Sequence, residues 1–81
     1  MSNTSEPSVF STTDIYLVAA LSVVGRRPDT VTRANARMTF HWSTSVKDLV
    51  EQYYAGSLEV SARDYASEIK NFKTIIHNPT T

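Results

Sequence analysis

The residues best suited to chemistry in this sequence are basic and lie close together in the middle of the chain. Residues 25–42 carry four arginines against one acidic residue, for a local net charge of +3, whereas the whole chain has a net charge of zero. Guanidinium groups bind phosphates and guanine edges, and a two-stranded ribbon can enter the major groove of DNA. The candidate residues for binding a nucleic acid or an acidic protein partner are Arg26, Arg27, Arg33, Arg37 and His41.

A simpler interpretation of the same residues stays open. Charged side chains on a strand are often a solvated face, or protect an exposed sheet edge from pairing with another chain. A chain with eight basic and eight acidic residues also lacks the strong overall positive charge of many nucleic-acid-binding domains.

No pattern in the sequence indicates catalysis. The two histidines, His41 and His77, lack the spacing of a metal-binding helix, and the chain has no cysteine. The glycines, Gly25 and Gly56, lie too far apart to form a phosphate-binding loop. Acidic pairs such as Asp48/Glu51 and Asp64/Glu68 are better explained as acids that favour the first turn of a helix. We therefore expect no enzyme, no metal and no cofactor.

Three helices are predicted from a recurring start signal, Ser-x-x-Asp followed by an apolar residue. A serine can cap a helix, and an acid three residues later favours its first turn. The signals begin at Ser11, Ser45 and Ser61, and we expect helices over about 12–24, 46–55 and 62–77. Gly25, Gly56 and Asn78-Pro79 are the expected ends.

Between the first two helices the hydrophobic period changes to that of a strand. Met38, Phe40 and Trp42 alternate with polar residues. The β-branched run 30–33 is expected to pair with this strand through a turn at Ala34-Asn35, since asparagine tolerates a positive φ.

The predicted fold is thus a small α+β domain in which three helices pack on a two-stranded antiparallel hairpin, in the order α-β-β-α-α. We expect residues 1–9 to be a disordered polar tail, 10–78 a single globular domain and 79–81 a flexible end.

The first helix is apolar almost all round, which a small core covers with difficulty, so we expect self-association as a homodimer. Its apolar run is about half the length of a membrane span, and we expect no membrane partner. Most aromatic residues are expected in the core. Tyr53 and Tyr54 are adjacent and cannot both face inward from a helix, so Tyr54, with Tyr16, is the candidate surface aromatic for a partner.

The chain resembles a family of short prokaryotic and phage proteins classed as a domain of unknown function. The residues that carry the resemblance are Thr12-Thr-Asp14, Leu17-Val-Ala-Ala-Leu21, Gly25, Phe40-His-Trp42, the segment Leu49–Gly56 and the segment Tyr65–Lys73. Trp42 departs from the usual phenylalanine of that pattern. The resemblance implies a bacterial, archaeal or phage setting and supplies no catalytic residues.

Taken together, these patterns favour a non-enzymatic module that binds another protein or assembles with itself. The expected location is the cytoplasm of a prokaryotic cell, or the host cell or virion for a phage protein. A small nucleic-acid-binding accessory protein that uses the arginine-bearing hairpin is the alternative.

Overall fold

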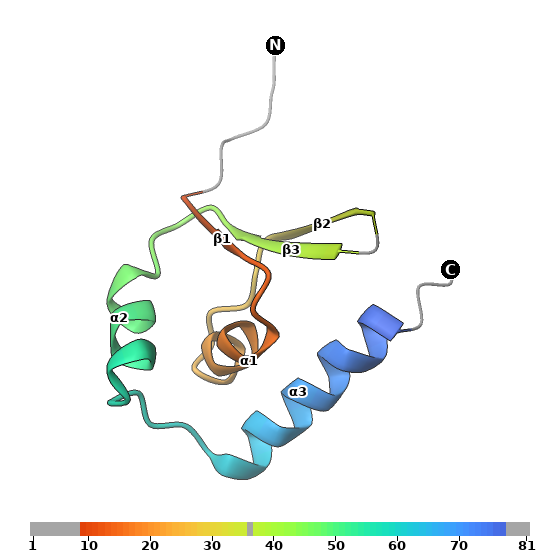
Figure 1. Cartoon of the computed structure of the whole chain (residues 1–81). Helices are drawn as coiled ribbons and strands as arrows, with labels where there is room; N and C mark the ends of the chain where they lie inside the picture. The colour runs from red at the N-terminus through yellow and green to blue at the C-terminus, as the bar shows by residue number, and fades with distance from the viewer. Residues whose placement is uncertain (1–8, 36, 78–81) are drawn as a thin grey trace.

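The chain forms a mixed α+β fold of three helices and a three-stranded antiparallel sheet (Figure 1). The structure is a computed structural model, and it describes residues 9–35 and 37–77. The elements are β1 (Phe10–Thr12), α1 (Ile15–Val23), β2 (Thr30–Ala34), β3 (Arg37–Trp42), α2 (Lys47–Ala55) and α3 (Ala62–His77). The predicted fold class is confirmed. The tail and the flexible end lie outside the described residues, except Val9, whose N–H donates to the carbonyl oxygen of Trp42.

The prediction of two strands was wrong, because β1 adds a third. Ser11, expected to cap the first helix, lies in β1 opposite His41. Asp14 caps α1 instead: its Oδ1 accepts hydrogen bonds from the N–H groups of Tyr16 (3.0 Å) and Leu17 (3.4 Å). Residues 10–12 are extended and pair with β3, and α1 begins at Ile15, later than expected, so the order is β-α-β-β-α-α.

The remaining helix ends follow the predicted signals more closely. The Ser61 hydroxyl accepts from the N–H of Asp64 at 3.3 Å, and α3 begins at Ala62 as expected. Helix α2 begins at Lys47, one residue later than expected. The residue before it, Val46, makes no capping hydrogen bond with its side chain. Gly56 ends α2 with a left-handed φ of 79°, a conformation that favours glycine. The expected stop at Asn78-Pro79 lies outside the described residues.

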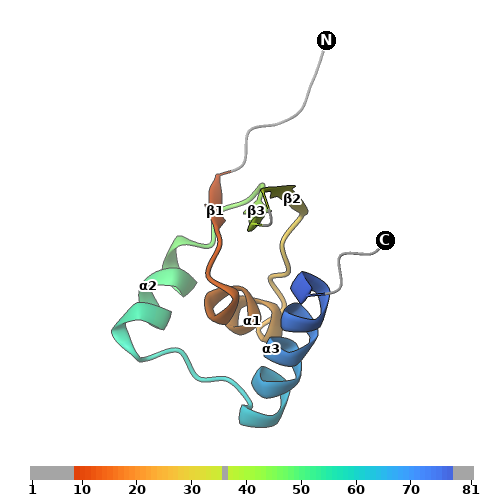
Figure 2. The same cartoon turned by 45° about the vertical axis from the view of Figure 1, so that its right-hand side comes forward.

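Helix α1 forms the centre of the molecule. The sheet lies across one side of it, and α2 and α3 flank it (Figures 1 and 2). Every residue from Leu17 to Ser22 is at most 5% exposed. The reason given for self-association was therefore wrong: one chain covers the apolar circumference of α1 by surrounding it on three sides. Dimerisation itself stays a prediction.

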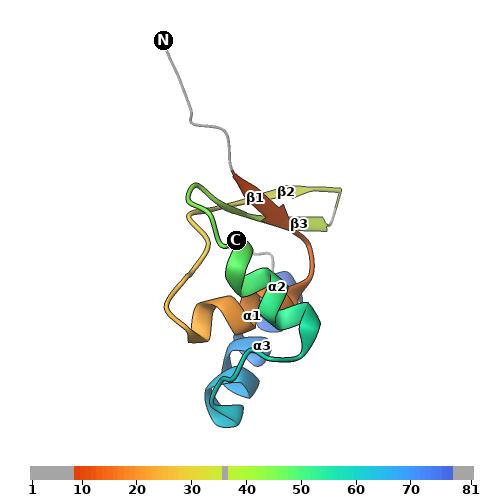
Figure 3. The ribbon, with the colours of Figure 1, turned by 90° about the vertical axis from the view of Figure 1, so that its left-hand side faces the viewer.

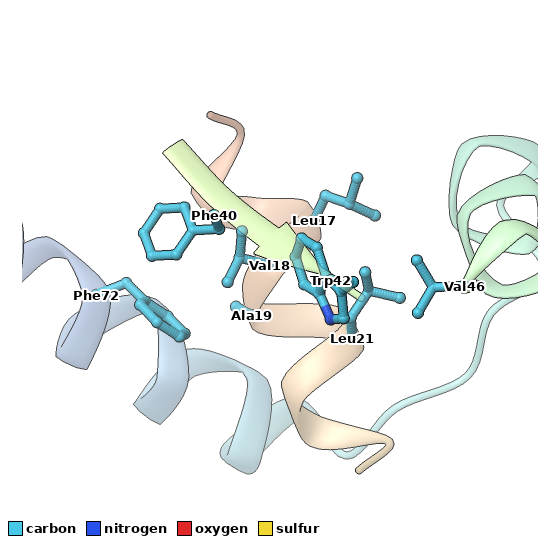
Figure 4. Close-up of a cluster of buried hydrophobic side chains, with 8 residues drawn as sticks. All are labelled: Leu17, Val18, Ala19, Leu21, Phe40, Trp42, Val46 and Phe72. Atoms are coloured by element: carbon cyan, nitrogen blue, oxygen red, sulfur yellow. The ribbon is translucent and has the colours of Figure 1, made fainter. Parts of the chain in front are cut away.

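The core lies between α1 and the inner face of β3. Figure 4 shows α1 side chains packed against Phe40 and Trp42, with Val46 and Phe72 at the two ends of the cluster. The rings of Phe40 and Phe72 meet edge to face, with centroids 5.4 Å apart. These aromatic residues were predicted for the core. Tyr53 and Tyr65 are only half-buried, and Tyr54 is 64% exposed.

The sheet has the strand order β1-β3-β2, so β1 and β2 are its two edges. The predicted alternation is confirmed, since Met38, Phe40 and Trp42 face the helices. Asn35 begins the turn between β2 and β3 with the expected positive φ of 53°. All three helices lie on one side of the sheet (Figure 3). The outer face is polar and carries Ser11, Thr30, Thr32, Arg37, Thr39 and His41.

Candidate protein-interaction surface

The arginines of the predicted basic site do not converge. Arg26 is folded back on the loop before α2: its Nη2 donates to Oγ1 of Thr44 at 2.9 Å and to the carbonyl oxygen of Ser45 at 3.1 Å. Arg27 forms a salt bridge with Glu68 of α3, with Nη2 and Oε2 2.8 Å apart. Both side chains thus hold parts of the same chain together.

The other two arginines lie on opposite faces of the sheet. Arg33 pairs in register with Met38 and shares its helix-facing side, and its Nη2 lies 3.2 Å from Sδ of Met38. Arg37 lies on the outer face with His41, whose Nε2 is 2.9 Å from Oγ1 of Thr32. The expectation that Arg33, Arg37 and His41 share the outer face was wrong, because two residues separate Ala34 from Arg37 and this spacing fixes opposite faces for residues 33 and 37.

The tyrosines, in contrast, gather at one place. Tyr16 lies in the first turn of α1, Tyr53 and Tyr54 approach from α2, and Tyr65 approaches from α3. The Tyr54 hydroxyl donates to Oδ2 of Asp14 at 3.4 Å, and the Tyr65 hydroxyl donates to the carbonyl oxygen of Tyr16 at 3.3 Å. The rings of Tyr53 and Tyr54 meet edge to face at 5.0 Å. We call Tyr16, Tyr53, Tyr54 and Tyr65 the tyrosine cluster.

The cluster combines exposed rings with neutral hydroxyl groups. Tyr16 is 44% exposed, and Nζ of Lys73 lies 5.7 Å from the centre of its ring. Desolvation raises the pKa of Tyr53 well above the ordinary value for tyrosine, and a hydrogen bond with Tyr65 adds to this. Desolvation and the nearby Asp14 carboxylate also raise the pKa of Tyr54. Tyr53 and Tyr54 therefore stay protonated at neutral pH, and their hydroxyls can donate as well as accept.

An apolar groove lies between β1 and α2. Its walls are formed by Val9 and Phe10 on one side and by Val46 and Val50 on the other, and it encloses about 410 Å³. Val9 is 60% exposed. Lys47, Glu51 and Ser45 complete the lining. We call this hollow the β1–α2 groove, and its size and apolar walls suit a large aliphatic or aromatic side chain.

The groove and the tyrosine cluster are neighbours on α2. Residues four apart lie next to each other on a helix surface, so Val46, Val50 and Tyr54 follow one another along one side of α2. Across from them the chain runs from β1 to Asp14, which accepts the Tyr54 hydroxyl. One continuous surface therefore begins at the apolar groove and ends at the exposed tyrosines.

Two further properties bear on the kind of site. Within residues 9–35 and 37–77, no three of the metal-binding side chains histidine, aspartate and glutamate come close enough to hold an ion. The helices of the described chain are too short or too polar to cross a bilayer. Glu68, one member of the acidic pair Asp64/Glu68, forms the salt bridge with Arg27.

Comparison with known proteins identifies no relative. No family model matches the chain, no curated protein matches it, and no solved structure matches it. The resemblance to the prokaryotic and phage family therefore stays a prediction, as do its setting and location.

The sequence identified two members of this surface, Tyr16 and Tyr54, and missed the rest. The groove depends on β1, a strand that the sequence patterns did not predict. Val46 is 2% exposed and Val50 is half-buried, so both pack in or against the core while they line the groove. The gap between β1 and α2 that forms the groove depends on how these two elements pack, which no local pattern encodes.

Proposed function

We propose that this protein is a non-enzymatic interaction module that binds an extended segment of another protein on the surface formed by the β1–α2 groove and the tyrosine cluster. The supporting observation is that the four tyrosines gather at the start of α1, where Tyr54 bonds Asp14 and Tyr65 bonds the carbonyl oxygen of Tyr16, beside an apolar groove. Tyrosines are enriched in protein interfaces because one rigid side chain offers both a large apolar ring and a hydrogen-bonding group.

The partner segment would place a large apolar side chain in the groove and polar groups over the tyrosines. The edge of β1 lies along the groove and supports the binding of an extended chain. The carbonyl oxygen of Trp42 accepts from the N–H of Val9, so the backbone groups of residues 40 and 42 of β3 point toward β1 and bond Thr12 and Phe10. The N–H and C=O of Ser11 then point to the open edge and can pair with a partner backbone.

The nucleic-acid alternative has less support. Binding a nucleic acid with the hairpin requires its basic groups to reach the same phosphates or the same groove. Arg26 and Arg27 are engaged within the chain, and Arg33 and Arg37 lie on opposite faces of the sheet. We therefore favour a protein partner.

A displayed library of random peptides tests the proposal. Selection on the purified protein should enrich peptides with large apolar side chains, and their affinity should fall about 30-fold or more for Tyr54→Ala, as for a hot-spot tyrosine. Val50→Asp, which places a charge in the groove, should have a similar effect. Tyr54→Phe separates the contribution of the ring from that of the hydroxyl.

The matched control is Ile75→Ala, which removes an exposed apolar side chain of α3 outside this surface and should leave peptide affinity unchanged. Deleting residues 1–8 reveals whether that segment competes with the peptide. The proposal fails if no peptide is enriched, or if the enriched peptides bind Tyr54→Ala and Val50→Asp as well as they bind the wild type.

A further inference from the structure

The second open edge of the sheet, β2, is longer than β1 and fully exposed. All five of its residues, Thr30 to Ala34, are exposed, and no strand of the described chain lies beyond it. Such an edge is a template for pairing with another chain unless a proline, a bulge, a cover or charged side chains protect it, and Arg33 is the one charged residue among residues 30–34. Residues 30–34 contain no proline. This edge is distant from the tyrosine cluster and is not used by the function proposed above.

The direction of the backbone groups on β2 follows from two hydrogen bonds of β3. The carbonyl oxygen of His41 accepts from the N–H of Asp29, so it points toward β2, whereas the carbonyl oxygen of Trp42 points toward β1. Backbone groups alternate along a strand. Residues 37, 39 and 41 therefore bond their β2 partners Ala34, Thr32 and Thr30, respectively. The N–H and C=O groups of Val31 and Arg33 consequently point to the open edge.

The sequence at this edge is complementary to itself. It reads Asp29-Thr30-Val31-Thr32-Arg33. When two copies pair antiparallel with Val31 opposite Val31, each threonine lies opposite a threonine and each Asp29 lies opposite an Arg33. Opposite charges across a strand pair stabilise it, and like charges destabilise it.

Other registers lack this complementarity. A symmetric pair bonded through the open-edge groups must match Val31 or Arg33 with Val31 or Arg33. Pairing Arg33 with Arg33 brings like charges together, and pairing Val31 with Arg33 matches an apolar side chain with a charge. Only the register centred on Val31 joins apolar to apolar and acid to base.

The side chains at this edge differ in how far they are engaged. Val31 is 44% exposed. Among the described residues, the side-chain hydrogen bond of Arg33 goes to a thioether sulfur, a weak acceptor. Asp29, which precedes β2, accepts hydrogen bonds from the N–H and hydroxyl of Ser43 at Oδ2, so Oδ1 is the oxygen left for a partner's Arg33. The Ser43 N–H bond and its hydroxyl bond lower the pKa of Asp29, which keeps the carboxylate ionised.

Helix α3 adds apolar surface on the same side of the molecule. It lies under the β2 side of the sheet, as α2 lies under the β1 side (Figures 2 and 3). Ile75 of α3 is 49% exposed and lines a hollow with Arg27, which precedes β2. Joining two sheets about a two-fold axis perpendicular to them places both α3 helices beneath the junction, on the same side.

We propose that two copies of this chain associate through antiparallel pairing of their β2 strands, with Val31 at the two-fold axis and an Asp29–Arg33 pair at each end, to form one six-stranded sheet. The helices of both copies cover one face of this sheet, and the polar face with its threonines stays open. Each copy keeps its β1–α2 groove at the sheet edge opposite the junction, so the dimer presents this groove twice.

Sedimentation of the purified full chain over a concentration series up to about 1 mM tests this association, since short strand interfaces are weak. The wild type should shift from monomer to dimer. Arg33→Asp and Asp29→Arg should each weaken the dimer about tenfold or more, because each places like charges opposite one another. A mixture of these two variants should recover association, because acid again meets base at both ends.

The control is Arg37→Asp, which makes the same charge change on the outer face and should leave the dimer intact. Asp29→Arg also removes the hydrogen bonds to Ser43, so Val31→Pro supplies a second test. The N–H of Val31 points to the open edge, and proline there should block pairing while the bonds to β3 remain.

A chain that stays monomeric throughout, or a dimer indifferent to Arg33→Asp and Val31→Pro, overturns the proposal. A dimer lost in Tyr54→Ala would instead place the interface at the tyrosine cluster. Peptide binding should be unaffected by Arg33→Asp, so the two proposals fail independently.

Discussion

The indole Nε1 of Trp42 donates a hydrogen bond to the main-chain carbonyl oxygen of Arg26 over 2.9 Å, which joins the centre of the sheet to the loop that follows α1. Trp42 is 1% exposed, so its ring fills the core while its polar atom reaches a backbone acceptor. This contact fixes where the chain turns from α1 toward β2, and thereby positions the edge strand.

We expect Trp42→Phe to destabilise the protein by about 2–4 kcal/mol, because it leaves a carbonyl oxygen without its donor and a space beside α1. Urea unfolding measures the change. It is followed by circular dichroism and not by tryptophan fluorescence, because the variant lacks the only tryptophan of the chain. Arg26→Ala keeps the carbonyl and should cost less. An equal loss in both variants would show that the Arg26 side chain, and not the indole bond, determines the loop.

Local patterns predicted the central strand and the helix ends well because each depends on a few adjacent residues. The alternation of Met38, Phe40 and Trp42 needs only the period of a strand, and Gly56 needs only its tolerance of a left-handed φ. Strand β1 was missed because three residues are too few to show a period. Ser11 also begins a capping signal that Asp14 fulfils in its place.

The candidate site was harder to predict because it is assembled from distant elements. The sequence selected Tyr16 and Tyr54 as surface aromatics, and both are exposed, but the bond from Tyr54 to Asp14 depends on how α1 and α2 pack. The opposite faces of Arg33 and Arg37 could have been predicted, since any two-residue turn between them imposes this arrangement. The pairing of Arg27 with Glu68 depends on the position of α3 and has no local signal.

Ser22→Ala should leave the protein unchanged or stabilise it, by up to about 1 kcal/mol. Ser22 is 5% exposed in the last turn of α1, and its Oγ has no hydrogen-bond partner among the described residues. A buried hydroxyl without a partner costs free energy, and alanine has the higher helix propensity. Thermal unfolding measures the effect. The reverse change at the preceding turn, Ala19→Ser, should destabilise, and a loss of stability in Ser22→Ala would mean that the hydroxyl is satisfied in solution.

Asp29 should contribute a pH-dependent part of the stability at the acidic end. Hydrogen bonds from the N–H and hydroxyl of Ser43 lower its pKa below the ordinary aspartate value. The unfolded chain then takes up the proton first as the pH falls, so the contribution is complete above the ordinary value and is lost as the pH drops through the lowered pKa. The difference in unfolding free energy between wild type and Asp29→Asn should shrink over this range. Ser43→Ala, which removes the hydroxyl bond alone, should show a smaller pH dependence, and a difference that is constant with pH would contradict the assignment.

Tyr53 should make the protein less stable under alkaline conditions. Desolvation, aided by the bond with Tyr65, raises its pKa above the ordinary value of about 10, so the unfolded chain ionises first as the pH rises. The contribution of this hydroxyl is therefore complete below about pH 10 and falls as the pH climbs above it. Urea unfolding at a series of alkaline pH values should show a steeper decline for the wild type than for Tyr53→Phe. Phenolate absorbance of the folded chain, compared with that of the chain in urea, supplies the control, since part of the tyrosine titration should appear later in the folded protein. If the two titrations coincide, the tyrosine cluster is open to water and does not hold its hydroxyls protonated.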